Sequence, residues 1–283
     1  MDNPHRDLMT EGVDIPLPGA EDPFTVALAR QDRAAPDLVR DAIRRNDVML
    51  AFQPVVSATG AGTTLFYEGL VRIYDDTGRV IPAGSFIHAV ETQETGRIID
   101  CLSLEMGLAA LSEEPALRLS VNMSARSIGY PRWRRSLDRA LSDSPGLADR
   151  LILEITESSA MLMPDIVAAF MRDLQRQGVS FALDDFGAGF TSFRFLRQFY
   201  FDLAKIDGEF IRGIARNADN QVLTQALVSV AQHYDMLTVA ESVETTDDAA
   251  FLRGIGLDCL QGYFFGAPSI VPPWSAPRRR TSA

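Results

Sequence analysis

The chain has 283 residues, of which 46% are hydrophobic, and it carries a net charge of −11 at pH 7. This composition allows a sizeable core in one large domain or two ordinary ones. The acidic balance argues against binding DNA, RNA or an anionic membrane through a basic surface, although a small nucleotide could still occupy a local pocket. No long apolar run or signal peptide is evident. We therefore expect a cytoplasmic protein without membrane insertion, with Cys101 and Cys259 as buried thiols.

Three segments are expected along the chain. Residues 1–35 are rich in Pro, Gly and acidic residues without any period, so we predict a flexible N-terminal arm. Residues 36–270 contain no linker and predict a single domain. Residues 271–283 resemble the first segment in composition and predict a flexible C-terminal tail.

Eight short runs rich in apolar, β-branched or aromatic residues predict eight strands in the domain. In chain order they are LAFQPVV, TLFYEGLVRI, LRLSVNMS, LILEIT, VSFALDD, DLAKID, LTVAESV and CLQGYFF. Helical patterns separate the runs from the second onward, for example MPDIVAAFMRDLQRQG, where Gly178 marks the expected helix end. Strands that alternate with helices in this way predict a closed barrel.

The first connection differs from the others. Little more than SATGAG lies between the first two runs. A parallel crossover needs about a dozen residues, whereas an antiparallel hairpin needs only a few. The predicted fold is therefore of the α/β class, a modified TIM (β/α)8 barrel with an antiparallel first strand.

Polar residues stand among apolar neighbours in every predicted strand from the second onward: Glu68, Asn122, Glu154, Asp184 with Asp185, Lys205, Glu241 and Gln261. One acid in a strand usually lies on a solvated face, but seven successive strands make that interpretation hard to sustain. Functional sites of such barrels lie at the C-terminal ends of the strands. Carboxylates that converge there repel one another unless a cation neutralises them, so the pattern predicts a metal site.

The ligand types favour a hard cation. His5, His88 and His233 all lie away from the predicted strand ends, and oxygen donors suit Mg²⁺ or Mn²⁺ rather than zinc. With Asp185 beside it, Asp184 could bridge two ions, an arrangement that activates water for attack on a phosphodiester. Lys205 would then orient or deprotonate that water, or meet phosphate charge. Its alternative is a buried salt bridge to a neighbouring acid.

The motifs FQPVV, YEGLVRI, SVNMS, LEITES, ALDDFGAGFTSF, LAKIDGEFI, VAESVET and LQGYFFGAP occur in this order. Over roughly 45–270 the chain resembles the EAL-domain family, bacterial cyclic di-GMP phosphodiesterases. The resemblance implies a modified TIM barrel with an antiparallel first strand, as the short first connection suggests independently.

The resemblance also implies roles for individual residues. One metal ion would be bound by Glu68, Asn122, Glu154 and Asp184, and a second by Asp184, Asp185 and Glu241, with Lys205 activating or positioning the attacking water. Glu157 would anchor the loop GAGFTSF and couple metal binding to dimerisation. The dinucleotide would contact Gln53 and Arg72, and Gln261 and Glu244 would complete the site.

The implied function is hydrolysis of cyclic di-GMP to linear pGpG by a homodimer with two Mg²⁺ or Mn²⁺ ions. A possible separate regulatory or sensor protein would control the activity. Ca²⁺ is expected to bind but to support little turnover. Two alternatives stay open. One is a non-hydrolytic cyclic di-GMP receptor that acts through a protein partner, and the other is a phosphodiesterase for another nucleotide.

The chain departs from the family pattern at several positions. Gly69 stands where alanine is usual in the signature, and Ile73, Tyr200 and Ser242 replace a tryptophan, a proline and a glycine that are common there. The segment FIHAVETQETGRI is slightly longer than usual. None of these departures removes a proposed catalytic group, and a looser second strand at Gly69 could lower activity modestly.

Overall fold

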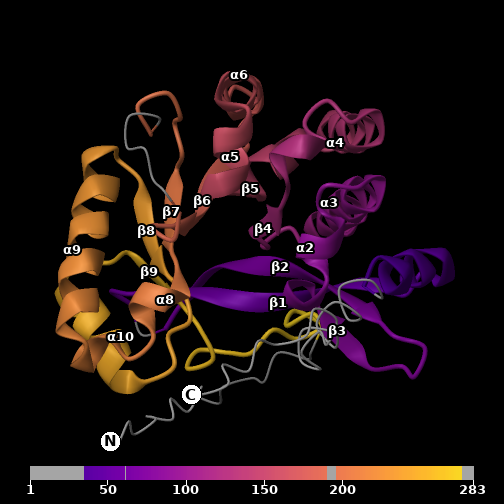
Figure 1. Cartoon of the computed structure of the whole chain (residues 1–283). Helices are drawn as coiled ribbons and strands as arrows, with labels where there is room; N and C mark the ends of the chain where they lie inside the picture. Colours follow the sequence, from indigo (N-terminus) through magenta and orange to yellow (C-terminus); the bar gives the residue numbers. More distant parts are fainter. Residues whose placement is uncertain (1–34, 61, 190–195, 276–283) are drawn as a thin grey trace, which may run out of the picture.

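The computed structural model describes residues 35–60, 62–189 and 196–275. Their strands form one sheet in the order β1-β9-β8-β7-β6-β5-β4-β2-β3, and a further pairing between β1 and β2 closes it into an eight-stranded barrel (Figure 1). The strands are β1 (Val48–Ser57), β2 (Thr64–Tyr74), β3 (Val80–Pro82), β4 (Leu119–Asn122), β5 (Leu151–Thr156), β6 (Ser180–Phe186), β7 (Leu203–Ile206), β8 (Leu237–Ala240) and β9 (Cys259–Gln261).

The strand directions confirm the predicted modified barrel. β1 runs antiparallel to both of its neighbours, β2 and β9, whereas β2, β4, β5, β6, β7, β8 and β9 pair in parallel. All eight predicted strands are present. The prediction missed β3, which lies outside the barrel and pairs antiparallel with the end of β2. A tight turn at Asp75 reverses the chain there, since its carboxylate accepts from the backbone N–H groups of Thr77 and Arg79.

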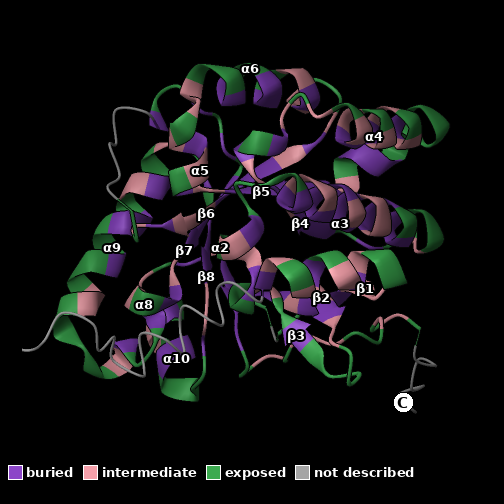
Figure 2. Cartoon of the chain, turned by 45° about the vertical axis from the view of Figure 1, so that its right-hand side comes forward, coloured by how far each residue is buried: buried purple, intermediate pink, exposed green. Residues whose placement is uncertain are grey.

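Helices surround the barrel and bury their inward faces (Figure 2). A helix covers residues 35–45, and the others are α2 (Ile87–Val90), α3 (Glu94–Glu113), α4 (Pro131–Asp143), α5 (Glu157–Leu162), α6 (Pro164–Gln175), α8 (Gly208–Ile211), α9 (Ala218–His233) and α10 (Thr246–Gly254). Beyond α6, Gly178 has φ 101°, so the expected helix end falls where glycine tolerates the left-handed backbone. Within the described ranges, no helix is long and apolar enough to cross a lipid bilayer.

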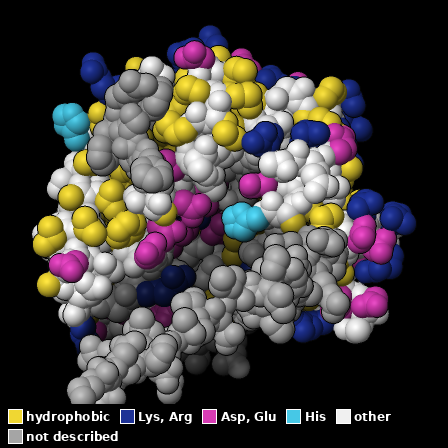
Figure 3. All heavy atoms as spheres, viewed as in Figure 1, with side chains coloured by type: hydrophobic (Ala, Val, Ile, Leu, Met, Phe, Trp, Pro, Cys, Tyr) yellow, Lys and Arg dark blue, Asp and Glu magenta, His cyan; other side chains and the backbone are white. Residues whose placement is uncertain are grey.

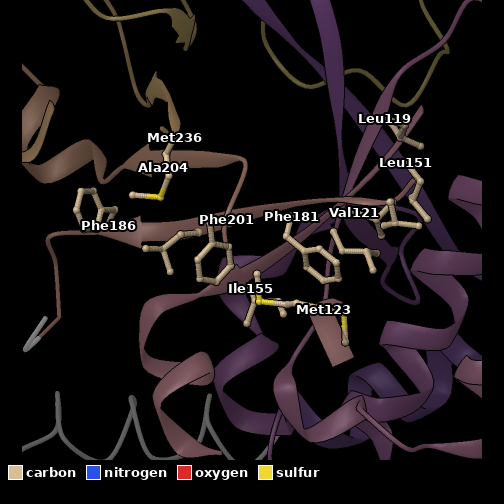
Figure 4. Close-up of a cluster of buried hydrophobic side chains, with 14 of the residues drawn as sticks. Leu119, Val121, Met123, Leu151, Ile155, Phe181, Phe186, Phe201, Ala204 and Met236 are labelled. Carbon is tan, nitrogen blue, oxygen red and sulfur yellow. The ribbon is translucent and has the colours of Figure 1, made fainter. Parts of the chain in front are cut away.

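Most of the core lies between the barrel and the helices. Figure 4 shows part of this layer, with residues such as Val121, Ile155 and Phe181 packed together. Both cysteines are buried free thiols, as predicted. Close packing of this kind fixes the strands that carry the polar residues.

The C-terminal end of the described chain packs on the first hairpin. Ser269 and Phe52 exchange backbone hydrogen bonds of 2.8 and 3.1 Å. Trp274, within the segment expected to be a flexible tail, lies edge-on against Phe52 and Tyr67 at ring-centroid distances of 4.7 and 5.8 Å. The arm expected at 1–35 lies outside the described residues up to residue 34, as does the tail from residue 276. The three segment boundaries stay predictions.

Candidate active site

The barrel interior contains two successive layers of side chains. The first is apolar and consists of Val55, Phe66, Ile152, Ala182, Leu203, Val239 and Cys259. Because side chains of a strand alternate between its faces, the residue two positions away points into the same interior. Those residues are polar: Gln53, Glu68, Glu154, Asp184, Lys205, Glu241 and Gln261. The sequence thus builds an apolar floor and places a polar layer above it at the strand ends.

Asp184 and Asp185 reach the same side of the barrel although they are consecutive. Asp185 has φ 55°, in the left-handed region, and the pairing of β6 with β7 shifts register between Leu183 and Phe186. A bulge of this kind re-aims a side chain and breaks the alternation, and aspartate tolerates the left-handed backbone better than most residues. Carboxylate oxygens of Asp184, Asp185 and Glu241 consequently lie within 4.8 Å of one another.

Lys205 lies at the centre of the polar layer. Its Nζ atom is 2.7 Å from Glu154 Oε2, 2.7 Å from Glu241 Oε1, 3.1 Å from Asp184 Oδ1 and 3.3 Å from Glu68 Oε2. The lysine side chain is 1% exposed. The ion-pair alternative weighed for Lys205 therefore describes its contacts in this structure, and the lysine touches four acids rather than one.

Charge crowding shifts the pKa values of the group. Burial would lower the pKa of Lys205, but the four carboxylates raise it well above its usual value, so the amine stays protonated. Burial, together with neighbouring acids, raises the pKa of Glu154 well above normal and that of Glu241 to about 8. Burial also raises the pKa of Asp185 to about 6, helped by Asp184. The layer holds more negative charge than one lysine can neutralise.

Neutral donors stabilise Glu68 as an anion. Burial alone would raise its pKa, but Lys205 and hydrogen bonds from Gln261 and Asn122 lower it below the usual value. Asn122 Nδ2 donates to Glu68 Oε1 at 2.9 Å, and Gln261 Nε2 donates to Glu68 Oε2 at 2.6 Å. Gln261 Nε2 also lies 3.2 Å from Gln53 Oε1, and Gln53 donates to the Gly266 carbonyl. The expected residues of β1, β2, β4 and β9 thus meet in one network.

The donor set fits a hard divalent cation. All candidate ligands are carboxylate or amide oxygens, which suit Mg²⁺, Mn²⁺ and Ca²⁺. Glu154 Oε1, Asp184 Oδ1 and Gln261 Oε1 are buried and accept no hydrogen bond from the described residues, although Asp184 Oδ1 makes the ion pair with Lys205. Unsatisfied buried oxygens are costly in a finished core, so their clustering here indicates a binding site.

A cavity of about 540 Å³ opens above the polar layer. In the space-filling view, acidic side chains gather in and beside a hollow near the centre of one face (Figure 3). Two further predicted residues line the cavity: half-buried Arg72 and Glu244, whose side chain is 51% exposed. The structure therefore brings Lys205, the four predicted substrate-binding residues and the predicted ligands other than Glu154 to the wall of one cavity. Glu154 is fully buried and contacts Lys205.

Glu157 lies apart from this cluster and contacts the loop after β6. It is buried, and its Oε2 atom accepts from the Gly187 N–H at 3.3 Å. Its carboxylate also lies against Gly189, where an added Cβ would come 3.1 Å from Oε1. These contacts fit the expected anchor. Residues 190–195 of the loop lie outside the described residues, and the link to dimerisation stays a prediction.

Sequence reasoning missed Asp100, a buried acid on α3 that lines the cavity. Its Oδ2 atom accepts from the Ser124 N–H at 3.0 Å and from the Ser127 hydroxyl at 2.5 Å, which holds the segment that follows β4. Burial raises the pKa of Asp100 to about 7. The sequence signal for Asp100 was a single acid within the apolar run IIDCLSL. The helix period alone does not show that the face of α3 that carries Asp100 borders the cavity.

Comparison with known proteins identifies the family. The EAL domain family matches residues 37–268. The chain belongs to the EAL domain family. Cyclic di-GMP phosphodiesterase PdeF of Escherichia coli (strain K12) is 30% identical over 234 residues, which cover 81% of this chain and 31% of the relative. Cyclic di-GMP phosphodiesterase PdeB of Shewanella oneidensis is 31% identical over 236 residues, with coverages of 81% and 27%. The chain thus spans about a third or less of these relatives.

Solved EAL domains have the same fold. The FimX EAL domain from Pseudomonas aeruginosa bound to c-di-GMP aligns with a TM-score of 0.75 and 25% identity, covering 83% of this chain and 96% of that one. The PaMucR phosphodiesterase in complex with c-di-GMP aligns with a TM-score of 0.73 and 28% identity, with coverages of 86% and 99%.

The glycine in this chain's EAL signature is tightly packed. A Cβ added at Gly69 would come 3.3 Å from both Leu50 Cδ1 and the Ser120 carbonyl oxygen. Gly69 also pairs with Phe52 on one side and Val121 on the other. The neighbours would have to shift by a few tenths of an ångström to admit a methyl group, so this part of β2 is closely packed, whereas the sequence suggested a looser strand. Whether the glycine lowers activity stays untested.

The crowded carboxylates predict a metal effect on stability that depends on pH. Asp185 and Glu241 have folded-state pKa values of about 6 and 8, above those of unfolded carboxyl groups. Such groups bind more protons when folded, so the metal-free protein loses stability as pH rises from about 4 to about 8. A divalent cation held by these acids would bind their deprotonated form and restore that stability. We expect Mg²⁺ to raise the melting temperature more at about pH 8 than at about pH 6.

Thermal melts with Mg²⁺ and with EDTA at both pH values measure this effect. Glu241→Gln is the informative control, because it removes the group with the higher pKa and should shrink the difference between the two pH values. An equal Mg²⁺ shift at both pH values would contradict the assignment of these acids to a cation site.

Proposed function

We propose that this EAL domain hydrolyses cyclic di-GMP to linear pGpG with the help of two divalent cations, Mg²⁺ or Mn²⁺. The observation that carries the proposal is the polar layer itself. Six oxygen-donor residues expected to bind metal surround Lys205 or lie beside it, under a cavity of nucleotide size. The names of the relatives support the choice of substrate.

The residues divide into two proposed ligand sets that share Asp184. Glu68, Asn122 and Glu154 would complete the first set, and Asp185 and Glu241 the second. Two cations held by these sets would supply an activated nucleophile and charge stabilisation for in-line attack on a phosphodiester. The left-handed backbone at Asp185 is what lets both sets share one strand end.

Lys205 would orient the attacking water and stabilise negative charge. Its raised pKa keeps the amine protonated, so it would act as a hydrogen-bond donor and a cation rather than as a base. Of the roles that the sequence left open for the lysine, the proposal therefore takes orientation of the water rather than its deprotonation. The dinucleotide would be bound by Arg72, Gln53, Gln261 and Glu244. Arg72 would contact a phosphate, since one guanidinium group can donate two parallel hydrogen bonds to phosphate oxygens.

Three further expectations belong to this proposal. The active form is a homodimer in which Glu157 links the loop after β6 to the metal site. Regulation comes from a separate regulatory or sensor protein. The substrate is cyclic di-GMP rather than another nucleotide.

The test is a turnover assay with product identification. Wild-type protein with Mg²⁺ or Mn²⁺ should convert cyclic di-GMP to pGpG, excess EDTA should stop the reaction, and Ca²⁺ should support little turnover because its looser geometry positions water poorly. Glu68→Ala should be inactive, whereas Glu113→Ala, on an exposed end of α3, should match wild type. Turnover that persists in EDTA would rule out the two-metal mechanism. Tight binding without product would instead favour the receptor alternative.

A further inference from the structure

Ser242 has an unusual backbone conformation beside the cluster. It directly follows Glu241 and has φ 54°, in the left-handed region that glycine adopts freely and other residues seldom occupy. The flanking backbone is held on both sides, because the Glu241 N–H donates to the Ile206 carbonyl and the Val243 N–H donates to the Gln261 carbonyl. A serine in this place is strained in a way that glycine would not be. Its hydroxyl is the group that a glycine would lack.

That hydroxyl accepts a hydrogen bond from Arg212 Nη2 at 3.1 Å. The contact is closely fitted, because a Cβ added to Gly208 would come 2.4 Å from Ser242 Oγ and 3.2 Å from Arg212 Nη2. Gly208 begins α8 and Arg212 follows its last residue. Two connections at the mouth of the barrel, one after β7 and one after β8, therefore meet through this hydroxyl.

The guanidinium of Arg212 has charge available for a ligand. Its side chain is 59% exposed and lines the same cavity as the carboxylate cluster. Glu244 Oε1 lies 3.9 Å from Arg212 Nε, beyond hydrogen-bond distance. By contrast, Lys205 is buried and contacts four carboxylates. Among the described residues, Arg212 thus hydrogen-bonds to a neutral hydroxyl, and its ion pair with Glu244 is long.

We propose that Arg212 binds a phosphate oxygen of the dinucleotide beside Glu241, and that Ser242 is the positioning residue that holds the guanidinium there. The inference rests on the proposed function, since its ligand is the phosphodiester substrate. Arg212 suits this task because its planar fork can hold Ser242 with one nitrogen and a phosphate oxygen with another. Without the hydrogen bond to Ser242, ligand binding would have to order the long and flexible side chain of Arg212.

The experiment compares four variants of the full chain with wild type. They are Ser242→Gly, Arg212→Ala, the double variant, and Arg216→Ala as the matched control. Arg216 is close in sequence and carries the same charge, but it is 88% exposed, lies 3.9 Å from Asp247 and does not line the cavity. The Kd for cyclic di-GMP in Ca²⁺, KM and kcat in Mg²⁺, and the melting temperature are measured for each.

Ser242→Gly should weaken binding and raise KM about five- to tenfold, the effect of having to order one long side chain, with kcat within about twofold of wild type. Its melting temperature should be equal or higher, because glycine relieves the left-handed strain. Arg212→Ala should weaken binding roughly 10- to 100-fold, as expected for a lost charged hydrogen bond. The double variant should bind no more weakly than Arg212→Ala, since Ser242 acts through Arg212. Arg216→Ala should match wild type.

Several outcomes would overturn the inference. They are an unchanged Kd in Ser242→Gly, additive losses in the double variant, or an equal loss in Arg216→Ala. Failure of the proposed function is a separate result, because wild type that binds cyclic di-GMP without hydrolysing it removes the catalytic proposal while the Kd comparison still decides the roles of Arg212 and Ser242. Wild type that does not bind cyclic di-GMP would refute both.

Discussion

Asp184→Asn is expected to lower kcat for cyclic di-GMP by about 1,000-fold or more, roughly 4 kcal/mol of transition-state stabilisation. Asp184 belongs to both proposed ligand sets. It shares the contact with the Lys205 amine with Glu68 and Glu154 of the first set, and one of its oxygens lies within 4.8 Å of oxygens of Asp185 and Glu241 of the second. Asparagine keeps the shape of the side chain but lacks the charge and one ligand oxygen. Single-turnover kinetics in saturating Mg²⁺ separates this loss from weaker substrate binding.

The control for Asp184→Asn is the same change at the next residue. Asp185 belongs to one proposed set, so Asp185→Asn should be clearly less damaging, although still strongly impaired. Thermal melts in EDTA show whether either variant is misfolded, and we expect neither to be destabilised, because each removes a negative charge from a crowded cluster. Equal and small losses of activity would mean that the acidic pair has a structural role.

The interior of the barrel was predictable because strand geometry has a period of two. Once a run such as LILEIT is recognised as a strand, Ile152 and Glu154 must face the same side. The parallel register then sets Asn122 opposite Glu154, because the C-terminal ends of parallel strands lie at the same edge of the sheet. The short first connection predicted the antiparallel β1 for an equally local reason, since chain length limits which crossover can form.

Other features depended on contacts that no local pattern encodes. The alternation rule would send Asp184 and Asp185 to opposite faces, and it fails because a bulge and a left-handed φ at Asp185 intervene. Three of the acids around Lys205 lie in three different strands and the fourth, Glu241, directly follows β8, so their distances exist only after the barrel closes. Arg212 and Ser242 are 30 residues apart and meet through the packing of two loops. Such features require the tertiary structure.

Lys205→Ala is expected to lower kcat by about 1,000-fold while cyclic di-GMP and divalent cations still bind. The sequence left two kinds of role open for Lys205, a catalytic one and a structural ion pair. The structure joins the two roles, because Lys205 contacts four carboxylates, so its removal alters the charge balance of the polar layer whatever its part in catalysis. Removing it leaves buried acids uncompensated, so the variant should lose about 3–5 kcal/mol of stability in EDTA.

Measurements of the Lys205→Ala variant with bound metal, rather than in EDTA alone, separate the catalytic role of Lys205 from its role in charge balance. Saturating Ca²⁺ should neutralise the acids and recover most of the lost melting temperature, because cation binding stabilises the folded state by mass action. Turnover in Mg²⁺ should not recover, since the amine that orients the water is still missing. Lys205→Met, which fills the space without charge, should behave in the same way and excludes a cavity as the cause. A variant that regains both stability and normal turnover in metal would show that Lys205 serves only to balance charge, and water activation would then depend on the metal ligands alone.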